Sequence, residues 1–214
     1  MISMALPVTS FDELNRLVGF ERSMSISKYF DDMHLTKQQK AHRKEMARKL
    51  YEEFVWLMSY MFYARQQGIS VSMDALEEIR QRYRDVVGDT VVIDLYLSAH
   101  IDSITADIID ATNRHRDDPY FYSKDRARVI AENETSTTID HSEYEDAVNG
   151  KRYKRWITIM DNHERESHAE ANGMVMPIDE PFELQGGFLQ YPHDGSLGCS
   201  EEELINCRCS CEYF

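Results

Sequence analysis

The spacing of hydrophobic residues is most regular between Thr36 and Gly68. Apolar side chains recur there at steps of three or four residues, as on one face of an α-helix: Met46, Leu50, Phe54, Leu57 and Met61. Thr36 and Gln39 fit a capping box at the start of this stretch, and Gly68 fits its end. We therefore predict a helix from Thr36 to Gln67, roughly 45 Å long at 1.5 Å per residue.

The second half of this helix, from Phe54 to Tyr63, is apolar on nearly every side. A helix of this kind is buried against several neighbours. Two interpretations stay open at this point. The methionine and aromatic side chains form the core of this chain, or they bury against a second subunit.

Two further stretches with helical spacing follow. One covers residues 72–87, and the other, capped by Asp89, covers residues 90–114. A shorter helix over 11–18 is predicted near the start of the chain, with Ser10 as its cap. Short turns marked by glycine separate these elements, which predicts an antiparallel arrangement of helices.

After Pro119 the pattern changes to short, mixed elements. The predicted elements are a helix over 124–134, a short helix ending at 148, a strand over 151–160, a helix over 161–171, strands over 174–177 and 187–191, and a helical turn over 201–204. The fold class is therefore predicted to be α+β. An N-terminal helical layer over 1–116 would precede a small α+β domain with short strands over 117–214.

Charge limits the classes of function. Of the 214 residues, 38 are acidic and 24 are Lys or Arg, which gives a formal net charge of −14. An acidic surface repels nucleic acid, so DNA contact is expected to be weak or indirect. The basic stretches Lys37–Lys49 and Lys151–Arg155 are interpreted as a solvated helix face and a basic loop.

No membrane contact is expected. Residues 1–9 lack the features of a secretory leader, and no apolar run approaches the length of a membrane span. The expectation is a soluble chain made in a cytoplasm. All four cysteines lie in the final sixteen residues. In a reducing compartment such a group indicates free thiols, a metal site or a local cross-link rather than a disulfide framework.

The last third of the chain carries residue types that bind metals. Asp161, Arg165 and His168 are spaced by four and three residues, which would place them on one face of the predicted helix. Cys207 and Cys209 would point the same way on an extended segment. Brought together, these segments would offer zinc four ligands: Asp161, His168, Cys207 and Cys209, with Cys199 and Cys211 as alternative ligands.

The same residues also permit interpretations without a metal. Asp161 would pair with Arg165 or Arg208, and the cysteines would pack as small apolar groups. The residue types of a thiol hydrolase triad are present in Cys207, His168 and Asp161. However, no glycine-flanked cysteine opens a helix, and no phosphate-binding loop is found. We therefore assign no catalytic residue.

The order of these residues resembles the phage Mu F-like domain, also called the phage head morphogenesis or minor head protein domain. The residues that carry the resemblance are Trp156, Asp161, Arg165, His168, Asn172-Gly173 and Asn206-Cys207-Arg208-Cys209, preceded by Arg126-Ala127, Ile130-Ala131 and Glu134-Thr135. The resemblance covers about residues 120–211. It implies a structural role for six motif residues: Glu134, Trp156, Arg165, Gly173, Asn206 and Arg208.

What the resemblance implies is a minor capsid protein of a tailed phage or prophage. Such a protein would act with the portal protein and other capsid or scaffold proteins in prohead assembly, with self-association and a part in genome packaging or ejection as further expectations. It would be found in the virion, inside the capsid or at the portal vertex, and in the host cytoplasm during assembly.

The alternative is an effector enzyme of phage origin, either ADP-ribosyltransferase-like or thiol-dependent. In that case Glu134, Arg165 and His168 would be functional. The surroundings of His168 distinguish the two alternatives. An open pocket with room for a nucleotide favours the enzyme, whereas a closed core favours the structural protein.

Overall fold

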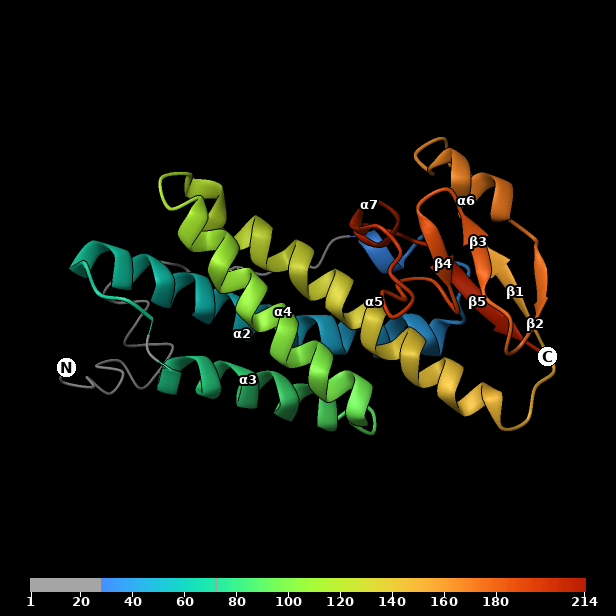
Figure 1. Cartoon of the computed structure of the whole chain (residues 1–214), viewed down its shortest axis with the longest axis horizontal. Helices are drawn as coiled ribbons and strands as arrows, with labels where there is room; N and C mark the ends of the chain where they lie inside the picture. The colour runs from blue at the N-terminus through green and yellow to red at the C-terminus, as the bar shows by residue number, and fades with distance from the viewer. Residues whose placement is uncertain (1–27, 72) are drawn as a thin grey trace. The chain divides into compact units, whose positions relative to one another are not determined.

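The computed structural model describes residues 28–71 and 73–214, which form six α-helices and five strands (Figure 1). The helix expected over 11–18 lies outside the described residues. The α+β class is confirmed: long helices come first along the chain, and short antiparallel strands lie near the C-terminus. The chain divides into two compact units, one holding Met46–Ala131 and the other holding residues 28–45 and Glu132–Phe214.

The first unit is helical. Its elements are α2 (Lys37–Gln67), which starts in the other unit, α3 (Met73–Gly88), α4 (Leu95–Arg114), the 3-10 helix η2 (Pro119–Tyr122) and the first turns of α5 (Lys124–Val148). The predictions for residues 36–67 and 72–87 agree with α2 and α3. The predicted start of the helix over 90–114 is wrong, because α4 is capped by Asp94 rather than by Asp89. The Asp94 side chain accepts a hydrogen bond from Leu97 N at 2.8 Å.

The methionine and aromatic stripe of α2 lies in the core of the chain itself. Trp56, Leu57 and Met58 are each at most 1% exposed. Arg126 of α5 is also buried here, and its guanidinium donates to Thr112 Oγ1 at 2.6 Å and to Phe121 O at 2.9 Å. Burial lowers the pKa of Arg126. These hydrogen bonds satisfy a charged group that the apolar surroundings would otherwise destabilise.

The second unit combines helices with strands. Its elements are η1 (Lys28–Phe30), the first turns of α2, most of α5, β1 (Tyr153–Ile157), α6 (Glu166–Ala171), β2 (Val175–Pro177), β3 (Phe182–Leu184), β4 (Gly187–Leu189), α7 (Glu201–Leu204) and β5 (Ser210–Tyr213). The strands form an antiparallel sheet in the order β2-β1-β5 and a separate hairpin of β3 with β4. Trp156 of β1 pairs with Cys211 of β5, so residues 55 positions apart become neighbours.

The helix break predicted at residues 135–140 is wrong, because α5 is continuous from Lys124 to Val148. Apart from Ile139, its buried positions in this stretch are polar: Thr135, Ser136, Thr138, Asp140 and His141 are each at most 6% exposed. A hydrophobic pattern cannot reveal a helix whose inward face carries hydroxyl, carboxyl and imidazole groups.

The helix predicted over 161–171 begins only at Glu166. Asn162 adopts a left-handed backbone conformation with φ of 65°, and Arg165 occupies the N-cap position. Asparagine tolerates this conformation better than most residues. Asp161 and Arg165 therefore precede the helix, and the shared helix face predicted for them with His168 does not exist.

The two compact units do not divide at the predicted boundary of residues 116 and 117. The helices α2 and α5 each contribute residues to both units, which a linear boundary cannot represent.

Within the described part of the chain, no helix combines the length and the apolar character needed to cross a membrane.

Candidate functional site

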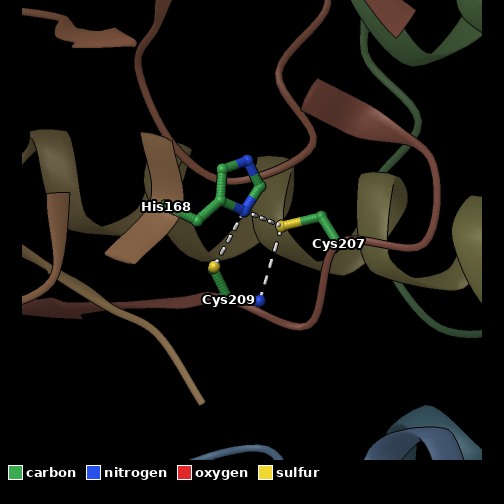
Figure 2. A group of neighbouring side chains, drawn as sticks. All are labelled: His168, Cys207 and Cys209. Atoms are coloured by element: carbon green, nitrogen blue, oxygen red, sulfur yellow. Dashed lines mark hydrogen bonds between the residues drawn. The ribbon is translucent and has the colours of Figure 1, made fainter. Parts of the chain in front are cut away.

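Three buried side chains with metal-binding atoms meet in the second unit: His168, Cys207 and Cys209. His168 comes from α6, and both cysteines come from the segment between α7 and β5. The Nδ1 atom of His168 lies 3.3 Å from the Sγ atom of Cys209 and 3.7 Å from that of Cys207. All three residues are at most 2% exposed. Figure 2 shows one imidazole nitrogen facing both sulfur atoms, with the other nitrogen turned away.

The backbone before β5 places the cysteines. Asn206 has φ of 58°, a left-handed turn directly before Cys207, and its N–H donates to Asn133 Oδ1 at 2.7 Å. The N–H of Cys209 then donates to Cys207 Sγ at 3.4 Å. Pairing of Ser210 with Ile157 fixes the next residue in the sheet. The alternation of an extended strand is therefore not what brings the two thiols together.

A glutamate faces the other side of the imidazole. Glu203 Oε2 lies 2.9 Å from His168 Nε2, and the same carboxylate accepts hydrogen bonds from Ser167 Oγ at 2.8 Å and from Gly186 N at 3.2 Å. The contact with Nε2 is off the line of a straight hydrogen bond, so we regard it as electrostatic. A Cβ atom added at Gly186 would lie 2.4 Å from Glu203 Cγ, so this close approach needs glycine.

Trp156 and Thr158 complete the surroundings of the imidazole. The Trp156 ring meets His168 edge to face at a centroid distance of 5.6 Å. The Thr158 hydroxyl donates to His168 O at 2.7 Å and lies 3.4 Å from Cys209 Sγ. Both side chains are buried, so the imidazole is held from several directions.

The structure places Asp161 outside this group. Its carboxylate forms a two-pronged ion pair with Arg208, at 2.8 and 3.0 Å, and this hydrogen bonding lowers the pKa of Asp161. The Arg165 guanidinium donates to the Ile205 carbonyl. Of the four predicted ligands, the fold thus brings together His168, Cys207 and Cys209, whereas Asp161 is paired as the alternative interpretation expected.

The remaining motif residues occupy structural positions. Trp156 is fully buried in the core of the second unit, and Glu134 is buried in α5. Gly173 has φ of 82°, a conformation that favours glycine, and its N–H donates to Trp156 O at 2.8 Å. Gly173 therefore ends α6 and returns the chain toward the sheet.

The two thiols differ in acidity. A hydrogen bond from Cys207 lowers the pKa of Cys209 to about 5 against the opposing effect of burial, and His168 and Thr158 add to this lowering. Burial raises the pKa of Cys207 well above its ordinary value. Of the two thiols, Cys209 is therefore the more acidic.

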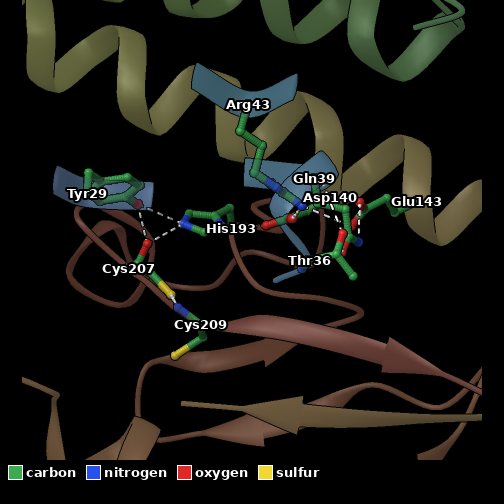
Figure 3. A network of polar contacts seen from close by, with 9 residues as sticks. All are labelled: Tyr29, Thr36, Gln39, Arg43, Asp140, Glu143, His193, Cys207 and Cys209. Atoms are coloured by element: carbon green, nitrogen blue, oxygen red, sulfur yellow. Dashed lines mark hydrogen bonds and ion pairs between the residues drawn. The ribbon is translucent and has the colours of Figure 1, made fainter. Parts of the chain in front are cut away.

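A second buried network holds the carbonyl group of Cys207 (Figure 3). This carbonyl accepts a hydrogen bond from the Tyr29 hydroxyl and lies 2.7 Å from His193 Nε2. His193 Nδ1 lies 2.7 Å from Asp140 Oδ2, and Asp140 Oδ1 accepts from Arg43 at 2.7 Å. The solvated position expected for Arg43 is wrong, since the residue is fully buried.

Sequence reasoning missed Glu203 and His193. Glu203 is one of three consecutive glutamates, and nothing in that run distinguishes the buried one. His193 has φ of 69° and contacts Asp140, which is 53 positions earlier in the chain. No local pattern predicts a pairing over that separation.

The basic loop predicted over Lys151–Arg155 also needs correction, because Lys154 is fully buried in β1. Its Nζ atom donates to Gln190 Oε1 and lies 5.2 Å from the ring centroids of Tyr144 and Phe182. Burial lowers the pKa of Lys154 from 10.5 to about 8. The charged form is thus less favourable in the folded chain than in the unfolded one.

We predict a pH-dependent stability difference between the native chain and Lys154→Met. Between pH 8 and 10.5 the unfolded chain binds more protons at Lys154 than the folded chain, so the native protein gains stability as pH rises. Denaturant titrations should show this gain relative to Lys154→Met, at less than about 1.4 kcal/mol per pH unit because solvent screens part of the effect. The exposed Lys151→Met is the control, and a difference independent of pH would disprove the assignment.

A small cavity of about 20 Å³ lies beside the thiols. His168, Cys209, His163 and Arg165 are among its lining residues. This volume holds about one water molecule. The arrangement can therefore bind a metal ion and a single small ligand, but it has no room for a nucleotide.

Comparison with known proteins gives a family match over most of the chain. The family described as "Phage Mu protein F like protein" matches residues 34–212. The chain is 28% identical over 133 residues to the Enterococcus faecalis protein named NAD(+)--arginine ADP-ribosyltransferase EFV. The aligned region covers 60% of this chain and 26% of that protein. It is 32% identical over 101 residues to the uncharacterized protein YqbB of Bacillus subtilis, which covers 44% of this chain and 32% of that protein. The chain thus spans about a third or less of either relative, and no solved structure matches it.

Proposed function

The chain belongs to the Phage Mu protein F-like family, and this membership supports a role in phage head morphogenesis. We propose that it is a non-enzymatic minor head protein and that it acts with the portal protein during prohead assembly. The family match covers residues 34–212, so it includes the long helices α2 to α5 as well as the strand-containing part. The family also suggests association with the virion. The family match supports head morphogenesis but does not itself identify the portal protein as the partner, so that part of the proposal is tested below.

One observation carries the choice of a structural protein: the cavity at the candidate site is too small for a nucleotide. The cavity beside His168 measures about 20 Å³, and the residues around it are engaged in structural contacts. Arg165 donates to a backbone carbonyl, and Glu134 is buried within α5. Binding pockets for nucleotide-sized ligands are usually several hundred Å³, so this site does not offer one.

The named activity of the Enterococcus relative does not argue against this proposal. The matched region covers 26% of that protein, so the match does not place its named activity in the shared part. The enzyme alternative is tested by incubating the purified chain with labelled NAD and an arginine-rich acceptor protein. We expect no transfer of label above a heat-denatured control. Transfer that Glu134→Gln abolishes would establish the alternative instead.

Exposed apolar side chains in the helical unit support docking on a partner. Val92 and Leu95, at the connection from α3 to α4, are 86% and 88% exposed. Apolar side chains with so much exposed surface are candidates for contact with another protein. We propose that this connection contacts the portal protein.

Co-purification tests the docking surface. The chain is co-expressed with the tagged portal protein of the same phage or prophage, as native chain, as Val92→Asp/Leu95→Asp, and as Phe188→Asp. The last variant is a matched control, because Phe188 is an exposed aromatic residue of the other unit. We expect the native chain and the control to co-purify with the portal and the double variant to be lost. Failure of the native chain to co-purify would contradict the role with the portal, whereas normal binding of the double variant would contradict only this surface.

A further inference from the structure

The three buried side chains His168, Cys207 and Cys209 have the separations of ligands around one tetrahedral metal ion. Zinc binds thiolate sulfur at about 2.3 Å and imidazole nitrogen at about 2.0–2.1 Å, so tetrahedral angles place these atoms about 3.6 Å apart. The observed distances from His168 Nδ1 to the two sulfur atoms, 3.3 and 3.7 Å, lie on either side of this value. The potential ligand atoms of all three residues lie within 4.8 Å of one another.

Two of the three potential ligands, His168 and Cys207, also have the supporting contact that metal ligands usually show, whereas the hydroxyl beside Cys209 already donates its proton to His168 O. The second nitrogen of His168 faces the Glu203 carboxylate at 2.9 Å. Cys207 Sγ accepts the N–H of Cys209, and Cys209 Sγ lies 3.4 Å from the Thr158 hydroxyl. A ligating imidazole usually donates its second N–H to a carboxylate, and Glu203 is the carboxylate placed to take this role.

Charge gives a further reason for a divalent cation. Two cysteines, one histidine and Glu203 are buried together beside the apolar side chains of Trp156, Phe182 and Leu189. An ionised thiolate in such surroundings is costly unless a cation neutralises it. The charge of one divalent ion cancels the charges of the two thiolates, without counting the Glu203 carboxylate on the far side of the imidazole. Soft sulfur ligands combined with imidazole in a tetrahedral arrangement favour zinc over magnesium or calcium.

We infer that the chain binds one zinc ion through His168 Nδ1, Cys207 Sγ and Cys209 Sγ, with Glu203 as a positioning residue and a water molecule in the adjacent cavity as the fourth ligand. The cavity touches His168 and Cys209 and holds about one water molecule. The ion would join α6 to the segment before β5, across 39 to 41 residues of chain. This site is independent of the proposed role with the portal.

Metal analysis and cobalt substitution of the whole chain test this inference. Purified protein should contain about one zinc per chain, and chelation should lower its melting temperature reversibly. Cobalt(II) loaded into the chelated protein should give the visible bands of a tetrahedral site and a near-ultraviolet thiolate-to-cobalt band. Because this spectrum needs no substitution, it is informative even where a variant fails to fold. Folded native protein that retains no zinc and gives no thiolate-to-cobalt band would overturn the inference.

The chain supplies matched controls for the ligands. Cys207→Ser, Cys209→Ser and His168→Gln should each lose zinc. Cys211→Ser and Asp161→Asn should keep it, because Cys211 belongs to β5 and Asp161 is paired with Arg208. Glu203→Gln should weaken zinc binding about 10–100-fold while keeping the thiolate-to-cobalt band. Loss of zinc in Asp161→Asn, or its full retention in both Cys207→Ser and Cys209→Ser, would contradict this ligand set.

Discussion

Replacing Arg43 with methionine should lower the free energy of unfolding by about 3–5 kcal/mol, the usual cost of removing one partner from a buried ion pair. The Arg43 side chain is fully buried, and it contacts Asp140 at 2.7 Å and Glu143 at 2.9 Å. Burial opposes its charge, but the two carboxylates outweigh burial and hold the pKa of Arg43 above its ordinary value. Without Arg43, Asp140 would be buried beside His193, whose Nδ1 lies 2.7 Å away and which carries a charge only when protonated. Urea titration at fixed pH and zinc concentration measures the loss.

Arg48 provides the matched control on the same helix. It pairs with Glu52 at 3.0 Å, and both side chains are more than a third exposed. Exposed pairs of this spacing contribute about 0.3–0.5 kcal/mol, so Arg48→Met should change stability little. Adding Asp140→Asn to Arg43→Met should recover part of the loss, because the unpaired carboxylate is then removed. If the free energy of unfolding of Arg43→Met lies within about 0.5 kcal/mol of the native value, the buried network does not stabilise this unit as described.

Truncation of Trp156 should be comparably severe, at about 3–5 kcal/mol for Trp156→Ala, because it removes the largest side chain from a packed core. Trp156 is fully buried, meets Phe182 edge to face at 5.3 Å and donates its indole N–H to Thr158 Oγ1 at 3.0 Å. The ring also packs against His168, so the variant should bind zinc more weakly as well.

Trp156→Phe separates packing from hydrogen bonding. It keeps most of the apolar volume and leaves the Thr158 hydroxyl without the indole donor, so we expect roughly 1–3 kcal/mol of destabilisation. The measurement is again urea unfolding, with the chelated protein compared in parallel. A Trp156→Ala protein as stable as Trp156→Phe would mean that the ring is not the centre of this core.

The elements that could be predicted from the sequence are those with local causes. The start of α2 is an example: Gln39 N donates to Thr36 Oγ1 at 3.2 Å, and Thr36 N donates to Gln39 Oε1 at 3.0 Å, as the capping box requires. The apolar residues of α2 recur at steps of three and four, which is the spacing of one helix face. The middle of α5 could not be predicted, since its buried face is polar and is satisfied by distant partners such as Tyr191, 2.8 Å from His141.

The candidate site follows the same division. Residue type and order pointed to His168, Cys207 and Cys209. Asp161 failed to join them because the backbone turns at Asn162 before α6 begins, which no spacing argument anticipates. Glu203 could be assigned only once the fold had placed α7 beside His168. The strand β5, which follows the cysteines, was missed because its pairing with β1 is a long-range contact.

The most direct test of the role with the portal is the amount of this chain in purified proheads assembled with and without the portal protein. Quantitative mass spectrometry of both particle types, normalised to the major capsid protein, gives the ratio. We predict that the chain is present at a fixed low number per particle when the portal is present and is lost when the portal gene is deleted. Equal amounts in particles that lack the portal, or absence from both kinds of particle, would contradict it.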